Sequence, residues 1–446
     1  MTKLWRYLLM FYILSVPVLA AEWTTFTAQN SGLPDNTVKA ICIDGYGRLW
    51  FGTNNGLALY DGSTWRTFTT ASTNSLLAAN AINDLVYQNS PTGKQLWVAT
   101  MNGISMLDIS ASDNIVFSTP YRTNNGSLVS NTVNALAVDP GHIRWFGTDQ
   151  GANSFTGSVW GVYTVQNWWL DTNMIKSLAA GPDSMVYLGT EGTGVSRLKM
   201  DPVDGITSAS TIDWTWSGLE DPEGDKLVSD SVYSILIEAD GRQWFGTDHG
   251  VCMHTGNNTK RDWTTWTTGK GLAHNFVQAI ARDKQGNMWF GTKAGVSRFD
   301  GASWQTFTTA NGLAGNEVFD IVVTANGAVW FCTNAGVSRY LAEGAAVAET
   351  PLQTPAAVSI NSYPNPFNMS TTIAFNLPAA GKANITICNI TGQKIRSLID
   401  GLFSPGHYSM TWDGRTDSGL PAQSGIYFVT LTSAGFSATW KVILAK

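Results

Sequence analysis

Three groups of residues in this sequence have side chains and spacing that could do chemistry. Trp168 and Trp169 are adjacent in one short loop, where their indoles could stack on sugar rings or aromatic ligands. Alternatively, one indole closes the loop and the other packs on a neighbouring element. Asp248, His249 and His274 could form a metal site or an acid–base pair. Two histidines without a third clear ligand are also explained by polar contacts at the surface.

The third group is an acidic insertion, SGLEDPEGDK, at residues 217–226. Such a cluster of carboxylates could hold Ca²⁺, but its spacing is not that of an EF-hand loop, and a solvated loop is the simpler interpretation. No metal, cofactor or catalytic residue is therefore predicted. The sequence has no GxSxG, HExxH or Walker motif, and no GxGxxG between a strand and a helix. A lyase or glycan hydrolase stays an alternative, because carboxylates from distant segments of a chain can come together in the folded protein.

A phrase that returns seven times indicates which elements position these residues. It runs from LWFGT at 49–53 to VWFCT at 329–333, and its anchors lie 41 to 57 residues apart. The aromatic anchors are Trp50, Trp97, Trp145, Tyr187, Trp244, Trp289 and Trp330. This period is that of a four-stranded propeller blade rather than of a helical solenoid.

Other residues recur with the anchors. Each copy ends on Thr, and each has an upstream Asn or Asp with a Leu three residues before it. The Asn or Asp residues are Asn36, Asn80, Asn131, Asn173, Asp230, Asn275 and Asn316. Residues present in every copy are assigned to the scaffold, with the Asn side chains capping backbone groups. A residue that breaks the repeat on the ligand-facing rim is the better candidate for a site.

The predicted fold is all-β, a seven-bladed β-propeller. In the first unit the strands are 38–44, 49–53, 56–61 and 65–69, separated by Gly, Asn and Asp turns. The last unit has its third strand at 336–341 but no outer strand, whereas a spare strand, 23–27, precedes the first unit. These two pieces are expected to complete one blade, which closes the ring and hides the sheet edges.

Near the channel mouth, the residue after the first apolar position of each inner strand varies. These residues are Lys39, Asn83, Asn134, Lys176, Tyr233, Gln278 and Phe319. The mixed polar and aromatic lining suits a neutral, hydroxyl-rich ligand, although an unused, water-filled channel would show the same pattern. Lys39, Lys176 and Tyr233 therefore join Trp168, Trp169, Asp248, His249 and His274 as candidate ligand-binding residues.

The two ends of the chain differ from the repeat. Lys3 and Arg6 precede an apolar run at 8–19, so residues 1–20 are predicted to be a cleaved export signal. The propeller would span 22–342, and 343–358 would be a linker. Alternating strands then predict an immunoglobulin-like sandwich at 359–446. Four cysteines, Cys42, Cys252, Cys332 and Cys388, have irregular spacing and are interpreted as buried thiols. The net charge is −6, which disfavours nucleic-acid binding.

The repeat resembles the two-component regulator propeller family, found as extracytoplasmic sensor regions of bacterial hybrid kinases. The resemblance rests on Leu-x-x-Asn, the D-x-x-G turn and W-F-G-T-x-x-G. No kinase-like segment follows in this sequence, so a membrane-spanning signalling role is not carried over. The C-terminal module resembles the type IX secretion sorting domain and the Ig-like domain of hook-capping proteins. That resemblance rests on YPNPFN (363–368), NITGQ (389–393), WDGRTDSG (412–419), SGIYF (424–428) and KVILAK (441–446).

Together these patterns predict an exported, non-enzymatic propeller that binds or senses a glycan or a surface protein. The resemblance of the C-terminal module implies sorting to the cell surface or the medium, by way of the periplasm. The expected partners are the ligand, the inner-membrane export machinery and the type IX machinery, and the chain is expected to be a monomer. A structural or adhesive envelope protein is the other alternative.

Overall fold

The protein is described by a computed structural model. The described residues are 22–90, 93–110, 114–126, 128–167, 169–182, 184–199, 227–256, 263–342, 359–363, 365–368, 370–377, 381–403, 406–433 and 436–445. The chain forms two compact units, which are the ring of sheets that precedes the segment 343–358 and the sandwich that follows it. The predicted export signal and linker lie outside the described residues.

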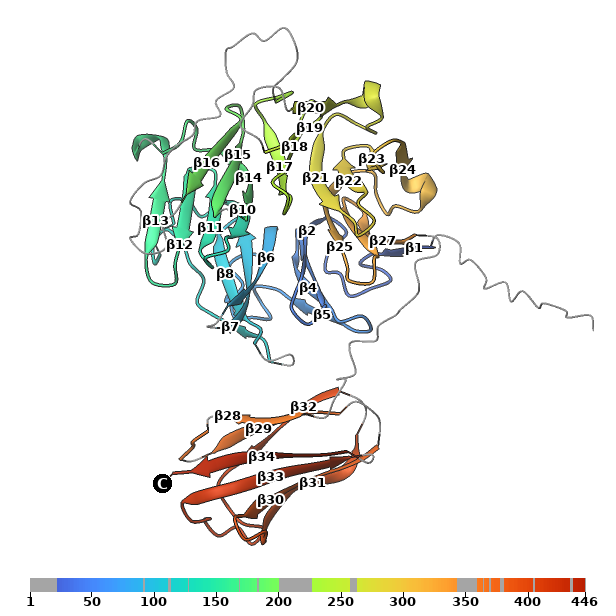
Figure 1. The fold of residues 1–446 in the computed structure, drawn as a ribbon. Coiled ribbons are helices and arrows are strands. Elements are labelled where there is room, and N and C mark those ends of the chain that lie inside the picture. Colours follow the sequence, from blue (N-terminus) through green and yellow to red (C-terminus); the bar gives the residue numbers. More distant parts are fainter. Residues whose placement is uncertain are drawn as a thin grey trace, which may run out of the picture. The chain divides into compact units, whose positions relative to one another are not determined.

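The first unit consists of seven antiparallel sheets, here called blades 1 to 7 (Figure 1). From the inner strand outward, blade 1 is β2 (Val38–Ile43), β3 (Leu49–Thr53), β4 (Gly56–Tyr60) and β5 (Trp65–Phe68). Blade 2 is β6 (Ile82–Ser90), β7 (Gly93–Thr100), β8 (Gly103–Asp108) and β9 (Val116–Phe117). Blade 3 is β10 (Val133–Val138), β11 (Arg144–Thr148), β12 (Gly151–Phe155) and β13 (Trp160–Tyr163).

Blades 4 to 6 repeat this order. Blade 4 is β14 (Ile175–Ala180), β15 (Met185–Thr190) and β16 (Val195–Lys199), and the segment that follows it lies outside the described residues. Blade 5 is β17 (Val232–Ile237), β18 (Gln243–Thr247), β19 (Val251–His254) and β20 (Trp263–Trp266). Blade 6 is β21 (Val277–Arg282), β22 (Met288–Thr292), β23 (Gly295–Phe299) and β24 (Trp304–Phe307). Three short 3-10 helices, η1 (Val165–Asn167), η2 (Thr268–Lys270) and η3 (Thr309–Asn311), lie in loops that lead to inner strands.

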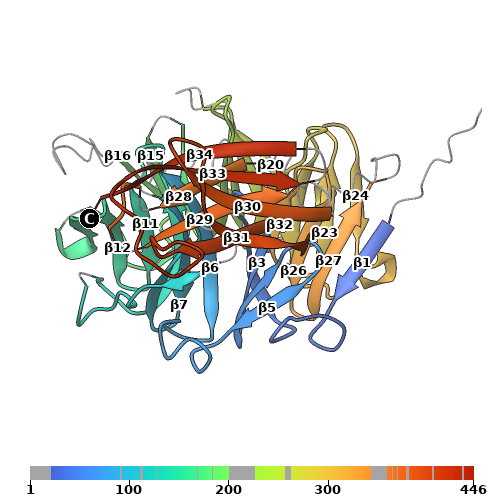
Figure 2. The same ribbon diagram turned by 90° about the horizontal axis from the view of Figure 1, so that it is seen from below.

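The ring closes through the N-terminal strand, as the sequence predicts. Blade 7 is β25 (Val318–Val323), β26 (Val329–Thr333) and β27 (Gly336–Leu341), and its outer strand is β1 (Glu22–Phe26). β1 lies beside β27 (Figure 2). The two strands pair antiparallel, with Trp23 opposite Tyr340. The strand is shifted by one residue from the predicted 23–27. Each inner strand contacts the next one round the ring, including β25 with β2, so the seven inner strands form a closed ring.

The recurring residues form the scaffold of each blade. The Thr that ends each second strand donates its hydroxyl hydrogen to a Gly carbonyl across the turn, from Thr53 to Gly56 at 2.7 Å in blade 1 and in all seven copies. The upstream Asn side chain accepts the backbone N–H of a residue that follows the preceding outer strand, as Asn36 does from Ala28 at 2.8 Å. The Leu of each copy is buried. The assignment of these residues to the scaffold is confirmed.

An acidic residue in the first hairpin of a blade holds the anchor indole. Asp44 accepts the Trp50 indole N–H at 2.9 Å and also the Arg48 guanidinium at 2.7 Å. Asp139, Glu238 and Asp283 hold their anchors in the same way. Satisfying a buried indole N–H keeps the anchor in the core without an unpaired donor.

The second unit is a two-sheet sandwich. One sheet is β28 (Ser359–Tyr363), β29 (Thr371–Leu377) and β32 (Gly406–Trp412), and the other is β31 (Lys394–Phe403), β30 (Gly381–Asn389), β33 (Gly425–Ser433) and β34 (Phe436–Leu444). Their inner faces share one apolar core that includes Trp412, Ile385 and Val429. β31 was not predicted, because its charged residues interrupt the apolar alternation.

The cysteines need one correction. All four are free, but only Cys252 and Cys332 are buried, whereas Cys42 and Cys388 are partly exposed. The prediction of four buried thiols is therefore half wrong. Cys388 departs from it because its side chain lies on the outward face of β30, between the inward-facing Ile387 and the end of the strand.

Candidate functional site

Every inner strand carries a β-bulge at the same place, and this bulge sets the geometry of the channel mouth. In blade 1 the register shifts between Val38 and Ala40, so Lys39 is the extra residue, and the same shift occurs in each of the other six blades. The bulged residues are the seven variable positions recognised in the sequence. A bulge re-aims one side chain without breaking the sheet, which gives each blade one adjustable position at the mouth.

In blades 2, 3 and 6 the bulged side chain bonds to the neighbouring blade. The Asn83 amide donates to the Val133 carbonyl at 2.8 Å, and the Asn134 amide donates to the Ile175 carbonyl at 2.9 Å. Gln278 donates to the Val318 carbonyl at 3.2 Å. In each case the acceptor is the first residue of the next inner strand, so these amides join consecutive blades.

In blades 4 and 5 the bulged side chains contact other side chains instead. The Lys176 ammonium pairs with the Glu191 carboxylate at 2.8 Å, and both groups are partly exposed. Burial raises the pKa of the Tyr233 phenol, and the charges of Glu191 and Asp248 add to that rise. Tyr233 therefore lies within electrostatic reach of carboxylates from the second-to-third-strand turns of two blades.

The Tyr233 ring continues this set of contacts into blade 6. It lies against the Phe276 ring with 4.4 Å between the centroids and a tilt of 40°. The Lys293 ammonium is 4.0 Å from the centroid of the Phe276 ring. We call Lys176, Glu191, Tyr233, Asp248, His249, Phe276 and Lys293 the mouth cluster. It contains four of the predicted site residues, Lys176, Tyr233, Asp248 and His249, which come from blades 4 and 5.

Asp248 and His249 form the most polar part of the mouth cluster. His249 Nδ1 is 2.8 Å from the Asp248 carboxylate, and the His249 side chain is 68% exposed. Partial burial acts to raise the pKa of Asp248, but hydrogen bonds from Ser229 and His249 outweigh it and hold that pKa below its ordinary value. Asp248 is thus a stable carboxylate at neutral pH, and the exposed imidazole edge faces solvent.

The other described site candidates lie at the edge of the mouth cluster or apart from it. His274 lies at its edge, because this exposed side chain accepts the backbone N–H of Phe276 at 2.9 Å. Lys39 lies on blade 1, and no contact joins it to the mouth cluster. Among the described His, Cys, Asp and Glu residues, no group of three or more could hold a metal ion.

The pair of indoles is only half described. Trp169 is half-buried against Tyr163, with 6.3 Å between ring centroids, and it packs on the core shared by blades 3 and 4. This packing supports the interpretation that Trp169 closes its loop. Trp168 and the acidic insertion 217–226 lie outside the described residues.

Two channel carboxylates were missed by the sequence analysis. Asp84 and Asp320 follow the bulges of blades 2 and 7, where the other blades carry Ala or Ser. Asp320 accepts the Ile41 N–H of blade 1 at 2.9 Å, and Asp84 accepts the Leu136 N–H of blade 3 at 2.6 Å. Each also accepts the N–H of the next residue in its own strand. Each carboxylate therefore links two blades across the channel wall.

The environment of these two carboxylates opposes their ionisation. Burial raises the pKa of Asp84 to about 7, and the charge of Asp320 adds to the rise. Burial likewise raises the pKa of Asp320 to about 7. Their backbone hydrogen bonds favour the charged form but do not compensate for burial. Both residues keep part of their surface exposed.

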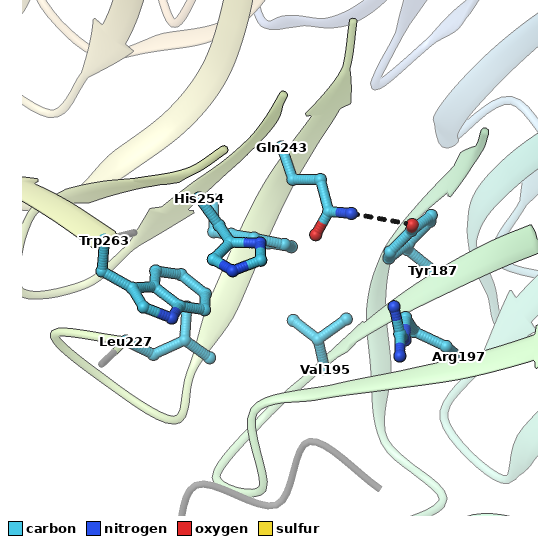
Figure 3. Close-up of a pocket in the computed structure, with 8 residues that line it drawn as sticks. Tyr187, Val195, Arg197, Leu227, Gln243, His254 and Trp263 are labelled. Carbon is cyan, nitrogen blue, oxygen red and sulfur yellow. Dashed lines mark hydrogen bonds between the residues drawn. The ribbon is translucent and has the colours of Figure 1, made fainter. Parts of the chain in front are cut away.

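A small cavity between blades 4 and 5 is lined by Tyr187, Arg197, Gln243, His254 and Trp263, among others (Figure 3). In blade 4 the anchor residue is Tyr187. Its hydroxyl accepts a hydrogen bond from the Gln243 amide of blade 5 at 3.0 Å, which the dashed line in Figure 3 marks. The free volume is about 10 Å³, which is room for about one water molecule. The cavity is too small for an organic ligand.

Comparison with known families agrees with the two parts of the chain. Residues 32–55 and 271–294 match the two component regulator propeller family, and 366–435 match the FlgD Ig-like domain. Both resemblances are confirmed. No curated protein matches the chain. Within the described residues, no helix is long and apolar enough to cross a membrane.

Solved structures share the fold at low identity. The extracellular domain of a hybrid two-component system from B. thetaiotaomicron is similar over 95% of this chain and 57% of its own, with a TM-score of 0.57 and 17% identity. PorZ, a surface component of the type IX secretion system of Porphyromonas gingivalis, is similar over 95% and 61%, with a TM-score of 0.56 and 17% identity. The chain thus spans less than two thirds of either protein.

A smaller propeller enzyme also has this fold. An inactive variant of virginiamycin B lyase from Staphylococcus aureus is similar over 72% of this chain and 99% of its own, with a TM-score of 0.52 and 12% identity. At these identities the similarity concerns the fold alone, and any assignment of function must come from the site.

Proposed function

We propose that this protein is an exported binding propeller whose ligand site is the mouth cluster. The observation that carries this proposal is the run of contacts Lys176–Glu191, Tyr233–Phe276 and Phe276–Lys293 across three consecutive blades. At the same bulge in blades 2 and 3, Asn83 and Asn134 join the blades together. Side chains that do not join neighbouring blades, and that lie at a partly exposed rim, are typical of a ligand-binding site.

The composition of the mouth cluster supports recognition of an organic ligand outside the cell. Tyr233 and Phe276 are half-buried, and they offer aromatic surface at small cost in side-chain entropy. The charged groups around them, Glu191, Asp248 and Lys293, can orient a polar ligand. A glycan fragment or an exposed segment of a surface protein provides such chemistry.

We further propose that the second unit directs the chain to the cell surface or the medium. The match of residues 366–435 to the FlgD Ig-like domain supports a sandwich of that kind, and the fold likeness to PorZ is compatible with a surface location. The partners in this route would be the inner-membrane export machinery and the type IX machinery.

Binding at the mouth cluster can be tested with the full-length chain on printed arrays of glycans and of surface-protein peptides. We expect a saturable signal that is lost in Tyr233→Ala and kept in Phe319→Ala. Phe319 is a matched control, because it is an aromatic bulged residue on blade 7, outside the mouth cluster. A signal that persists in Tyr233→Ala, or arrays that stay empty, would overturn the proposal.

One observation favours a second candidate function, an enzyme. The Asp248–His249 pair, at 2.8 Å, has the arrangement in which a carboxylate orients an imidazole as a general base. An enzyme predicts product release from a bound array ligand, and predicts that His249→Ala abolishes it. Binding without any product, unchanged in His249→Ala, would exclude this candidate.

A further inference from the structure

The mouth cluster already holds one ammonium group against an aromatic ring. Lys293 Nζ lies 4.0 Å from the centroid of the Phe276 ring, and its side chain is exposed. Among the described residues, no carboxylate forms an ion pair with Lys293. The negative face of the ring is therefore its main attraction. The space over Phe276 is thus a favourable position for a cation, and it is occupied by a side chain that can swing away.

One carboxylate of the mouth cluster, Asp248, has no lysine or arginine partner among the described residues. Glu191 is neutralised by Lys176 at 2.8 Å. Among the described residues Asp248 forms an ion pair only with His249, although it also accepts a hydrogen bond from Ser229, and its side chain is 27% exposed. Glu191 and Asp248 both act on Tyr233, whose ring touches that of Phe276. Among the described residues, the aromatic pair is therefore bordered by one carboxylate without a lysine or arginine partner and one ammonium without a carboxylate partner.

We infer that the mouth cluster takes a ligand that carries a primary ammonium group, and that Lys293 holds the place of that group over Phe276 until the ligand displaces it. The inference rests on the proposed function and specifies its ligand. Asp248 supplies the charge that favours the ligand's ammonium, and Tyr233 and Phe276 supply the aromatic surface. The ammonium can come from a lysine side chain of a peptide or from an amino sugar.

A neutral, hydroxyl-rich ligand fits the mouth less well. Hydroxyl groups are recognised by donors and acceptors such as side-chain amides. The amides at this level of the mouth, Asn83, Asn134 and Gln278, are already bonded to backbone carbonyls of neighbouring blades. The side chains that remain available are charged or aromatic. A ligand with an ammonium group therefore differs from the neutral ligand that the sequence suggested, and the titration below decides between them.

The test is isothermal titration of the full-length chain with two amines, Nα-acetyl-lysine amide and glucosamine. Their uncharged counterparts, Nα-acetyl-norleucine amide and N-acetylglucosamine, serve as ligand controls. We expect an amine to bind and its counterpart not to bind. Asp248→Asn should weaken amine binding about tenfold, whereas Lys293→Met should strengthen it about fivefold because the internal competitor is removed.

The opposite signs of these effects separate recognition from general damage to the fold. Asp149→Asn is the control for Asp248, because it changes the same turn position in blade 3. Lys94→Met is the control for Lys293, because Lys94 forms a similar contact with the Tyr46 ring, at 3.9 Å, outside the mouth cluster. Both controls should leave amine binding unchanged.

The outcomes distinguish this inference from the proposal on which it rests. Equal binding of the amines and their uncharged counterparts, or weaker amine binding in Lys293→Met, overturns the ammonium assignment. If the amines and their uncharged counterparts bind equally and Tyr233→Ala abolishes this binding, the mouth cluster remains the ligand site and only the ligand class is wrong. If Tyr233→Ala changes the binding of no ligand, both the proposed function and the ammonium assignment fail. Preference for one of the two amines identifies the source of the ammonium.

Discussion

Blades 2 and 3 and blades 4 and 5 have the same backbone at the channel mouth but use it differently. In the first pair, Asn83 and Asn134 leave the bulge and bond to the next blade's carbonyl. In the second pair, Lys176 and Tyr233 leave the same bulge and contact charged or aromatic side chains. One position can therefore either join the ring or contact charged and aromatic side chains, and the residue type decides between the two.

The side of the channel formed by blades 7, 1, 2 and 3 is further joined by carboxylates. Asp320 spans from blade 7 to blade 1, and Asp84 spans from blade 2 to blade 3. The blade that β1 completes is thus also held to blade 1 at its inner edge. On this side of the ring, these side chains of the inner strands join neighbouring blades. Blades 4 to 6 carry the candidate site.

The largest expected effect concerns the two channel aspartates. Their pKa values near 7 exceed the ordinary 3.8, so the folded state holds protons that the unfolded chain releases between about pH 4 and pH 7. The stability that these groups contribute is present at low pH and is lost as the pH rises through 7. We expect the free energy of unfolding to fall by about 5 kcal/mol from pH 5 to pH 8, and Asp84→Asn with Asp320→Asn to remove most of this fall.

Urea unfolding of both proteins at the two pH values measures this effect. The difference between the wild type and the double variant isolates the two aspartates from other titrating groups. Parallel pH profiles for the two proteins would contradict the assignment.

Trp169→Ala should have the next largest effect, and it should act on stability alone. The half-buried ring packs on Tyr163 and the core shared by blades 3 and 4, so its loss should cost about 2 kcal/mol. Ligand binding should be unchanged. Thermal unfolding and array binding of the same preparation check this. Lost binding with unchanged stability would return Trp169 to the list of ligand contacts.

Exchange of residue types at the bulge should have opposite effects in the two pairs of blades. Asn134→Ala should lower stability by about 1 kcal/mol through the lost hydrogen bond and keep ligand binding. Tyr233→Asn should abolish binding and change stability by less than about 1 kcal/mol. The new amide can donate to the Val277 carbonyl, which offsets the lost contact with Phe276. Chemical unfolding and array binding measure both, and binding retained in Tyr233→Asn would refute the contrast.

His249→Ala should have the smallest effect. The side chain is 68% exposed, so its removal should change stability by less than about 0.5 kcal/mol. Without the imidazole the pKa of Asp248 rises towards its ordinary value, and the carboxylate is still ionised at pH 7. Amine binding at pH 7 should therefore change by less than about twofold, and a larger loss would assign His249 a direct contact with the ligand.

The sequence predicts the seven-bladed scaffold well, because residues that recur in every blade can be told apart from residues that occur in one blade. The Thr53–Gly56 bond and the Asn36 cap recur in the blades, so their structural role follows from their number. The closure of blade 7 by β1 follows from one surplus strand and one missing strand. Repetition could not predict strand β31 (Lys394–Phe403), because this strand lies in the sandwich and has no second copy in the chain.

The site was predicted only in part, for two reasons. Asp84 and Asp320 could have been found, because the other blades have Ala or Ser at that position, but they lie one residue beyond the positions compared. Phe276 joins the mouth cluster through its contact with Tyr233 of blade 5, and Lys293 joins it through Phe276 in its own blade. The contact between the two blades depends on the tilt of neighbouring sheets, and a sequence repeat carries no information about that tilt.

The most direct test of this account compares four alanine variants in their affinity for the strongest array ligand, measured by isothermal titration at pH 7. Tyr233→Ala and Phe276→Ala change blades 5 and 6, and Asn83→Ala and Asn134→Ala change blades 2 and 3. We predict losses of at least about tenfold in the first pair and less than about twofold in the second. Equal losses in both pairs, or losses only in the second, would contradict the assignment of the ligand site to the mouth cluster.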